Sequence, residues 1–316
     1  MFLRKVALSA LCIAATFTAH SKAVDNEAMR SIHDVYGKTI EIPAQPKRVI
    51  TLSEIDLDST LALGLTPVGT VNGRGQQTLP RYLQAAIKQD IKIVGDLSRP
   101  NMETILELEP DLILTTPNRP EVLALLNEIA PTVVTFKRGE PWKDTFNRTA
   151  GILNRQKEAT AFMARYQQAV QQSKANIGDK VGQTISVVRW NPKGPAYMFK
   201  DSFASQVIAD LGMTRPANQQ DPGHTHSLSL SLEALNVLDG DWMVIGTLST
   251  SGDAVDAMKQ AESNPAFKQL SAIQTKRFEA VDGSLWTSVG GPLAALSVMQ
   301  DIVKLVNKPD AESLAP

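Results

Sequence analysis

Residues 156–176, QKEATAFMARYQQAVQQSKAN, decide the fold, because neither glycine nor proline interrupts these 21 positions. Glycine and proline are the residues least compatible with a helix interior, so their absence favours one continuous helix. At about 1.5 Å per residue, such a helix is about 30 Å long. We therefore predict a single long helix over residues 155–177 that links the parts of the chain on either side of it.

Short apolar runs alternate with helical patterns on both sides of this helix. We predict helices at residues 57–63, 102–108, 122–129, 206–211 and 232–238. The predicted strands lie at residues 49–52, 68–71, 112–114, 133–136, 185–190, 242–245 and 278–281. Strands that alternate with helices are typical of parallel β/α units with helices on both faces of the sheet. The predicted fold class is α/β, with two Rossmann-like lobes whose central sheets are mainly parallel, at residues 24–154 and 178–316.

One segment occurs in similar form in each predicted lobe. Residues 102–114 read METILELEPDLIL, and residues 232–244 read LEALNVLDGDWMV, with a glutamate eight residues before an aspartate in both. Any helix–turn–strand unit can show this pattern, so the match alone leaves two interpretations open. Its occurrence once on each side of the long helix favours two similar lobes.

The N-terminus has the three features of a secretory signal peptide. Arg4 and Lys5 precede an apolar run at residues 6–17, and Ser21-Lys22-Ala23 offers small residues at a cleavage site. The run is too short for a permanent membrane span. A buried N-terminal helix is the alternative, but nothing amphipathic supports it. We predict that residues 1–23 are removed and that the protein is periplasmic.

The only cysteine, Cys12, lies inside the apolar run and follows Leu11, whereas a lipoprotein has a small residue before its modified cysteine. We therefore predict a free protein and not a lipoprotein. Cleavage would leave no cysteine for a disulfide or a thiolate metal site.

The charge and the length of the mature chain limit its partners. Losing Arg4, Lys5 and Lys22 from 32 basic residues leaves 29 against 33 acidic ones, a net charge of −4. A nucleic-acid partner requires a basic surface, so none is expected. No other segment of the chain approaches the length of about eighteen consecutive apolar residues that a membrane span requires. Roughly 290 mature residues suggest two domains.

Three segments resemble one protein family. Residues 34–43 (DVYGKTIEIP) followed by 46–50 (PKRVI), residues 103–114, and residues 285–292 (LWTSVGGP) are similar to the periplasmic binding proteins for iron–siderophores, haem and cobalamin, and to the siderophore branch above all. The resemblance covers about residues 34–306. It implies capture of a ferric siderophore between the lobes and delivery to an ABC permease in the inner membrane. It also implies a monomer without a cofactor and without enzymatic activity.

The resemblance further implies that an acidic residue on each lobe docks on the permease. Asp58 falls at the position of the N-lobe acid, six residues before a glycine, although an ordinary surface carboxylate of a helix is the alternative. In the second lobe the equivalent position holds Gln206, so we take the nearest acid of that helix, Asp210, as the second docking residue.

Three arginines that follow or end strands are candidate ligand residues. Arg74 lies between two glycines after one strand, Arg119 follows another, and Arg189 ends a third. A guanidinium offers several fixed donors and stays charged, which suits an anionic ferric complex. The alternative for each arginine is a solvated loop charge. Arg189 is the strongest candidate, because a charge that closes an apolar strand has few structural uses.

Aromatic residues near the strand ends are further candidates. Trp190, Tyr197 and Trp286 could stack on the apolar arms or planar parts of a ligand. Each could instead pack in the core of its lobe. Trp142 is expected to pack against the linking helix.

Two histidines, His224 and His226, lie in the loop DPGHTH. Two nitrogens without carboxylates make a weak metal cage, so no direct metal site is expected. The family resemblance implies that His224 could complete the iron coordination of an unsaturated siderophore. A simple surface turn is the alternative.

Two other functions remain open at this point. A haem or cobalamin carrier of the same fold could use His224 or Tyr197 as an axial ligand. A secreted hydrolase is remote, because the chain has no Gly-x-Ser-x-Gly elbow, no His-Glu-x-x-His pair and no cysteine in its mature part. The chemical class of the siderophore is not determined by these patterns.

Overall fold

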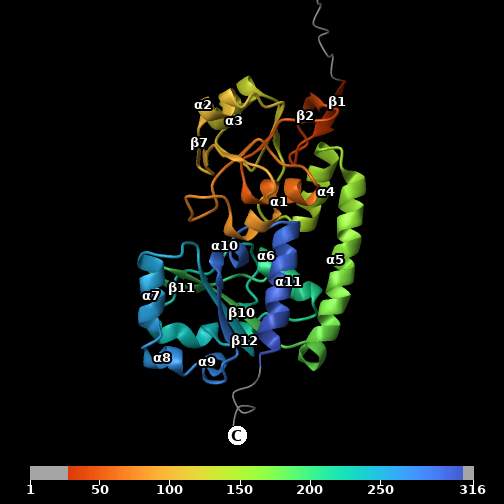
Figure 1. The fold of residues 1–316 in the computed structure, drawn as a ribbon. Coiled ribbons are helices and arrows are strands. Elements are labelled where there is room, and N and C mark those ends of the chain that lie inside the picture. The colour runs from red at the N-terminus through yellow and green to blue at the C-terminus, as the bar shows by residue number, and fades with distance from the viewer. Residues whose placement is uncertain (1–27, 309–316) are drawn as a thin grey trace, which may run out of the picture.

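The computed structural model describes residues 28–308, so the predicted signal peptide and Cys12 lie outside the described residues. Figure 1 shows two lobes, one above the other, connected along one side by a long helix. This arrangement confirms the predicted fold class.

The N-terminal lobe is built on a five-stranded sheet in the order β5-β4-β3-β8-β9, in which every neighbouring pair is parallel. Its strands are β3 (Val49–Thr51), β4 (Gly69–Thr70), β5 (Lys92–Ile93), β8 (Leu112–Thr115) and β9 (Thr132–Val134). Two small antiparallel pairs lie outside this sheet, β1 (Met29–His33) with β2 (Thr39–Pro43), and β6 (Gly95–Asp96) with β7 (Arg99–Pro100). The helices are α1 (Glu54–Ala62), η1 (Arg81–Ala86), α2 (Met102–Glu107), α3 (Pro120–Ile129) and α4 (Trp142–Ile152).

The C-terminal lobe has a four-stranded sheet in the order β11-β10-β12-β13. Strands β10 (Ile185–Asn191), β12 (Trp242–Thr247) and β13 (Phe278–Asp282) are parallel, and β11 (Gly194–Tyr197) forms an antiparallel edge. The helical elements are η2 (Gly178–Lys180), α6 (Phe203–Asp210), η3 (Ala217–Gln219), η4 (Leu232–Leu238), α7 (Asp253–Ala261), α8 (Pro265–Lys268), α9 (Ser271–Gln274), α10 (Gly283–Trp286) and α11 (Pro292–Val306). The two similar sequence segments form α2–β8 in one lobe and η4–β12 in the other.

The linking helix α5 (Gln156–Ile177) has 22 residues and ends at Gly178, whose φ of 64° breaks the helical conformation. Its buried side chains recur every three to seven residues along one stripe, at Ala159, Phe162, Tyr166, Val170 and Ile177. The ring of Trp142 in α4 meets Tyr166 edge to face at 5.1 Å between centroids, as predicted for Trp142.

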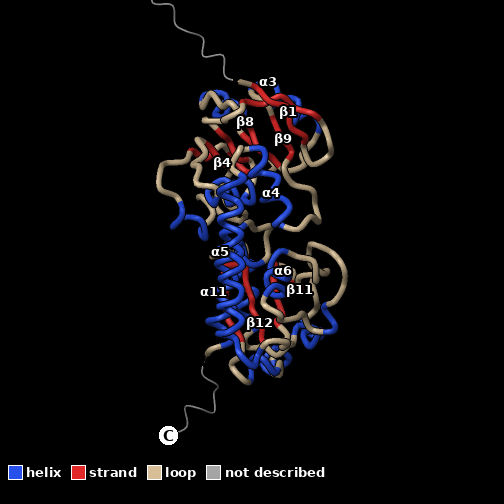
Figure 2. Tube along the Cα trace, turned by 90° about the vertical axis from the view of Figure 1, so that its right-hand side faces the viewer, coloured by secondary structure: helices blue, strands red, loops and turns tan. Residues whose placement is uncertain are grey.

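The C-terminal helix α11 ties the lobes together a second time. It packs against α5 and α6 and, near its first turn, against α1 and η1 of the other lobe (Figures 1 and 2). One cluster of buried apolar side chains runs from Val49 and Leu112 through α5 to Ile185 and Val244. Because this core is continuous from one lobe to the other, it does not mark where either lobe ends. The predicted boundaries at residues 154 and 178 therefore remain predictions.

Among residues 28–308, no helix combines the length and the hydropathy that a bilayer span requires.

Candidate functional site

The ends of the parallel strands bring loops from both lobes to the junction between them (Figure 1). Ligands of open α/β sheets bind at this edge, beyond the carboxyl ends of the strands. Two loop pairs touch across the junction. A Cβ atom added to Gly139 would lie 2.4 Å from Nε2 of His224, and one added to Gly75 would lie 2.9 Å from Cβ of Leu248. The junction is therefore the candidate ligand cleft, and its two sides are in contact.

Arg189 on β10 is a buried cation that has no carboxylate partner within residues 28–308. Its side chain and backbone are only 3% exposed. Within residues 28–308 its guanidinium makes one hydrogen bond, from Nε to Oγ1 of Thr287 at 2.9 Å. Burial, and to a smaller extent the neighbouring Arg74 cation, lower the pKa of Arg189 to about 10. Because a buried charge is costly unless it is paired, this position favours an anionic group on a ligand.

Arg74 lies beside Arg189 on the N-lobe side, and Glu54 lies beside Arg74. The backbone N–H of Arg74 donates to Oε1 of Glu54 at 2.9 Å, while the Arg74 side chain is exposed. The other oxygen of Glu54, Oε2, accepts from Oγ of Ser288 at 2.9 Å, across the lobe junction. Burial raises the pKa of Glu54. Two guanidinium groups therefore lie near each other, and Glu54 contacts the second of them, Arg74, through its backbone.

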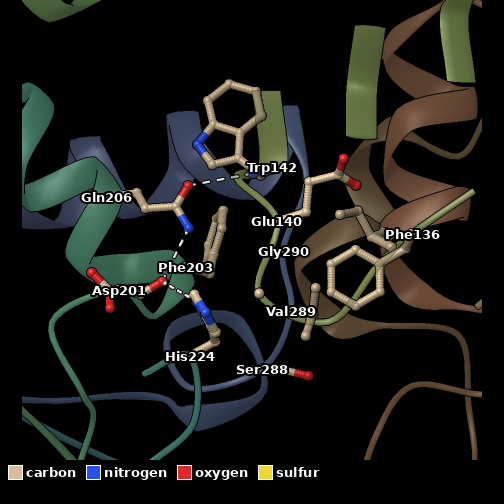
Figure 3. Close-up of a pocket in the computed structure, with 12 residues that line it drawn as sticks. Phe136, Glu140, Trp142, Asp201, Phe203, Gln206, His224, Ser288, Val289 and Gly290 are labelled. Carbon is tan, nitrogen blue, oxygen red and sulfur yellow. Dashed lines mark hydrogen bonds between the residues drawn. The ribbon is translucent and has the colours of Figure 1, made fainter. Parts of the chain in front are cut away.

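A pocket with an empty volume of ≈ 330 Å³ opens at another part of the cleft (Figure 3). Phe136 and Glu140 line it from the N-lobe, and Asp201, Phe203 and His224 line it from the C-lobe. Apolar rings and a few polar groups in one concave space are typical of small-molecule sites. Gly139 and His224, from opposite lobes, are in contact at this pocket, so a bulky ligand requires the loops to separate.

His224 lies where the sequence places it, at the cleft. It is exposed, and its Nδ1 lies 3.3 Å from the backbone oxygen of Asp201, which leaves Nε2 facing Gly139. His226 is turned away, with Nδ1 2.8 Å from the backbone oxygen of Ser227, and it does not line the pocket.

Arg119 is exposed at the N-terminus of α3, and its side chain makes no hydrogen bond or ion pair within the described part of the chain. The Arg119 side chain can therefore contact a ligand, but no described residue orients it in the cleft.

The three aromatic candidates lie in the protein interior, which corrects their prediction as cleft residues. Trp286 is fully buried, and its indole N–H donates to Oδ2 of Asp301 at 3.1 Å. Trp190 is 2% exposed and packs edge to face on Phe267. Tyr197 is 8% exposed, and its hydroxyl donates to Asp221. All three are core residues, because their strands and helices turn these side chains inward.

Neither predicted docking acid is a free surface carboxylate, so this prediction is also corrected. Asp58 is 0% exposed and accepts backbone hydrogen bonds from the start of α11. Asp210 is half-buried, forms an ion pair with Lys143 at 2.7 Å and accepts from the hydroxyl of Tyr166. Both carboxylates hold the lobes and the linking helix together.

No group of three or more histidine, cysteine, aspartate or glutamate side chains within residues 28–308 is arranged to hold a metal ion.

Four residues of the site were not predicted from the sequence, namely Glu54, Phe136, Thr287 and Ser288. Thr287 and Ser288 lie in the quoted segment 285–292, where attention fell on the tryptophan. Glu54 directly follows a predicted strand and could have been found by the same rule that selected the arginines.

Comparison with known proteins gives consistent likenesses. Residues 49–284 match a family described as periplasmic binding protein. The chain is 31% identical over 312 residues to a probable siderophore-binding lipoprotein, YfiY, of Bacillus subtilis, covering 96% of this chain and 95% of that protein. It is 29% identical to an achromobactin-binding periplasmic protein of Dickeya dadantii, covering 82% of this chain and 86% of that protein.

Among solved structures, the fold is similar to that of SirA from Staphylococcus aureus complexed with staphyloferrin B, with a TM-score of 0.76. The identity is 26%, and the match covers 88% of this chain and 98% of SirA.

Proposed function

Because this chain belongs to the periplasmic binding protein family, as the resemblance predicted, we propose that it captures a ferric siderophore and delivers it to an ABC permease for iron uptake. Relatives named for siderophores, achromobactin and Fe(3+)-citrate support this function. The observation in this chain that carries the proposal is Arg189, a buried cation at the cleft whose side chain lacks an anionic partner among the described residues.

The charges at the cleft favour an anionic complex. Arg74 and Arg189 lie near each other, and Glu54 lies beside Arg74. Guanidinium groups bind carboxylate and phenolate oxygens through charge-assisted hydrogen bonds. We expect citrate-type and catecholate ferric complexes to bind more tightly than neutral hydroxamates.

Isothermal titration calorimetry with the purified protein tests this function. The panel holds ferric citrate-type, catecholate and hydroxamate complexes, with haem and cobalamin as rivals. Saturable binding of one ferric complex that Arg189→Ala weakens and Arg99→Ala does not would support the proposal. Arg99 is the control because it is exposed and pairs only with Asp96. Binding of haem or cobalamin, with no binding of any ferric complex, would contradict the siderophore assignment.

The protein needs neither a resident cofactor nor catalysis for this task. The iron is cargo and arrives with the oxygen ligands of its siderophore, so the chain has to recognise the complex and not the bare ion. His224 is the one histidine at the pocket that could add a ligand to an unsaturated complex. We expect no turnover of ester or peptide substrates.

A pair of equivalent carboxylates, Glu103 and Glu233, is better placed for permease docking than the acids first predicted. They occupy the same position of the two similar segments, in the first turns of α2 and η4. Both are exposed, and neither forms an ion pair or a side-chain hydrogen bond within residues 28–308. The pair thus offers one free charge on each lobe.

Charge reversal at both positions tests docking. Glu103→Arg with Glu233→Arg should abolish stimulation of the permease ATPase while ligand affinity stays unchanged. Glu121→Arg, an equally exposed first-turn acid on α3, is the matched control. Full stimulation by the double variant would exclude this docking pair.

The compartment is proposed to be the periplasm, reached as a monomer after removal of residues 1–23. Relatives include both a periplasmic protein and a lipoprotein by name. Intact mass spectrometry separates these two forms. A chain that begins at Val24 would support the free protein, whereas a lipid-modified Cys12 would contradict it. Light scattering of the same sample checks that it is monomeric.

A further inference from the structure

The buried carboxylate Asp58 caps a helix of the opposite lobe. Its Oδ1 accepts from the backbone N–H of Leu293 at 2.7 Å, and Oδ2 accepts from those of Ala294 at 3.0 Å and Gly291 at 3.2 Å. The first N–H groups of a helix have no partner inside that helix. Usually the N-cap side chain supplies an acceptor, but the N-cap of α11 is Gly291, which has none. Asp58, on α1 of the N-lobe, performs this role from outside.

The packing around this carboxylate fits the role closely. A Cβ atom added to Gly291 would lie 2.8 Å from Cγ of Asp58, so only glycine lets the carboxylate approach the backbone. Asp58 is 0% exposed, and no basic side chain forms an ion pair with it in residues 28–308. Its charge faces the positive end of the α11 dipole, which favours an anion.

Helix α1 also contacts the loop of residues 287–291, which precedes α11, through a second carboxylate. Glu54 lies one turn before Asp58 on α1 and accepts from Oγ of Ser288. The residue before it, Thr287, receives the only hydrogen bond that the Arg189 guanidinium makes among the described residues. Two carboxylates of α1 therefore hold the segment 287–294, which in turn orients Arg189.

We propose that Asp58 is a positioning residue, which caps α11 across the lobe junction and thereby fixes the loop 287–291 that holds Arg189 in the cleft. The link to ligand affinity rests on the proposed function, but the link to lobe geometry does not. Asp58 touches no ligand in this proposal; it acts through Gly291 and Thr287.

Asp56 provides a matched control on the same helix. It is also 0% exposed, but its side-chain partners, Ser53 and Thr135, both lie in the N-lobe. Removing Asp56 should therefore destabilise the protein without loosening the lobe junction.

The test measures the distance between the lobes with two nitroxide labels. The full chain carries Cys12→Ser, which removes its only cysteine, with Lys92→Cys on β5 and Lys268→Cys on α8 as exposed label sites. Pulsed electron–electron double resonance then gives the distribution of distances between the two labels without any ligand. Calorimetry gives the affinity for the ferric complex.

We expect Asp58→Ala to broaden the distance distribution and to weaken ferric-complex binding by about tenfold or more, which corresponds to about 1.4 kcal/mol. Asp56→Ala should leave both unchanged while it lowers the thermal midpoint. A folded Asp58→Ala protein with the wild-type distribution and affinity would overturn the proposal, and so would equal broadening by Asp56→Ala. If Asp58→Ala does not fold, Asp58→Asn, which keeps one acceptor oxygen, is judged by the same criteria. The distance measurement stays decisive even if no ferric complex binds.

Discussion

The N-lobe buries acids, whereas the C-lobe buries bases. Asp56 and Asp58 are both 0% exposed, and Arg189 and Arg215 are 3% and 4% exposed. Each charge needs polar partners in the interior, because an isolated buried charge is strongly unfavourable. Asp56 accepts from two hydroxyl groups and Asp58 from three backbone N–H groups. Arg215 donates to two backbone carbonyls and to Gln219.

Arg189 is the exception among these four groups. Its one hydrogen bond within residues 28–308 leaves most of its donors without a protein acceptor. The buried acids of the N-lobe therefore stabilise the fold, whereas one buried base of the C-lobe, Arg189, can still bind a ligand at the cleft. Five measurements can test this difference between the two lobes.

The largest effect is expected for Arg215→Ala, on stability alone. The change removes the donor of two buried carbonyls and of Gln219, each worth about 1–3 kcal/mol when left unpaired. We expect the free energy of unfolding in urea to fall by about 3 kcal/mol. Ligand affinity of the folded protein should stay unchanged. A parallel loss of affinity would mean that Arg215 is not purely structural.

Arg189→Ala should show the opposite pattern, with lost affinity and little lost stability. Truncating one partner of a buried charge pair costs about 2–5 kcal/mol, so we expect binding of the ferric complex to weaken about 100-fold. Arg189→Lys keeps the charge but loses the bond to Thr287, and it should recover only part of the affinity. Calorimetry measures both variants. Unchanged affinity would remove the central argument for the cleft.

Arg74→Ala should have a smaller effect that depends on salt. Its side chain is exposed, so we expect about a tenfold loss of affinity at low ionic strength. Salt screens exposed charges much more than buried ones. The difference between wild type and Arg74→Ala should therefore shrink at high salt, while that for Arg189→Ala persists. Equal salt dependence would contradict the assignment of one exposed and one buried cation.

The stability of the protein should depend on pH in the way expected for a buried acid. Burial raises the pKa of Asp58 to about 7 from 3.8. A folded-state pKa above the unfolded one means that the folded protein binds more protons between these values, so stability falls as pH rises through that window. Relative to Asp58→Asn, we expect wild type to lose stability between pH 5 and 7, at no more than about 1.4 kcal/mol per pH unit.

Urea unfolding of both proteins across this range measures the difference. A wild-type stability that rises with pH relative to Asp58→Asn would show that the three N–H groups outweigh the burial of the carboxylate.

The smallest effect is expected for Arg119→Ala. The arginine is exposed and unsupported by other described side chains, so its removal should change affinity by less than about twofold, or 0.4 kcal/mol. A larger loss in the same titration would extend the binding surface to the start of α3.

Local features of the fold were predictable because local sequence causes them. The linking helix was expected from residue 155 to 177 and spans Gln156–Ile177, since no helix breaker occurs before Gly178. Buried parallel strands were recognised by their apolar runs. The short strand β4 lies within the predicted strand 68–71, but the two-residue strand β5 and the edge strand β11 carry too little pattern for such detection.

The directions of side chains were much less predictable. The segment 285–292 supplied Trp286 as a candidate ligand residue, but the segment is closely packed, and a Cβ atom at Gly290 would meet the ring of Phe203 at 2.5 Å. That segment is glycine-rich because the protein packs tightly around it. Trp286 and Asp58 are buried for the same reason, and no sequence period reveals contacts between residues more than 200 positions apart.

The cap of α11 also has a consequence for the order of folding. Asp58 and Leu293 are separated by 235 positions, so the acceptor is synthesised long before the helix that it completes. Contacts of such long range form late, because a large loop must close first. A growing or partly exported chain therefore cannot assemble the lobe junction until the first turn of α11 is present, and the binding cleft forms only after that point.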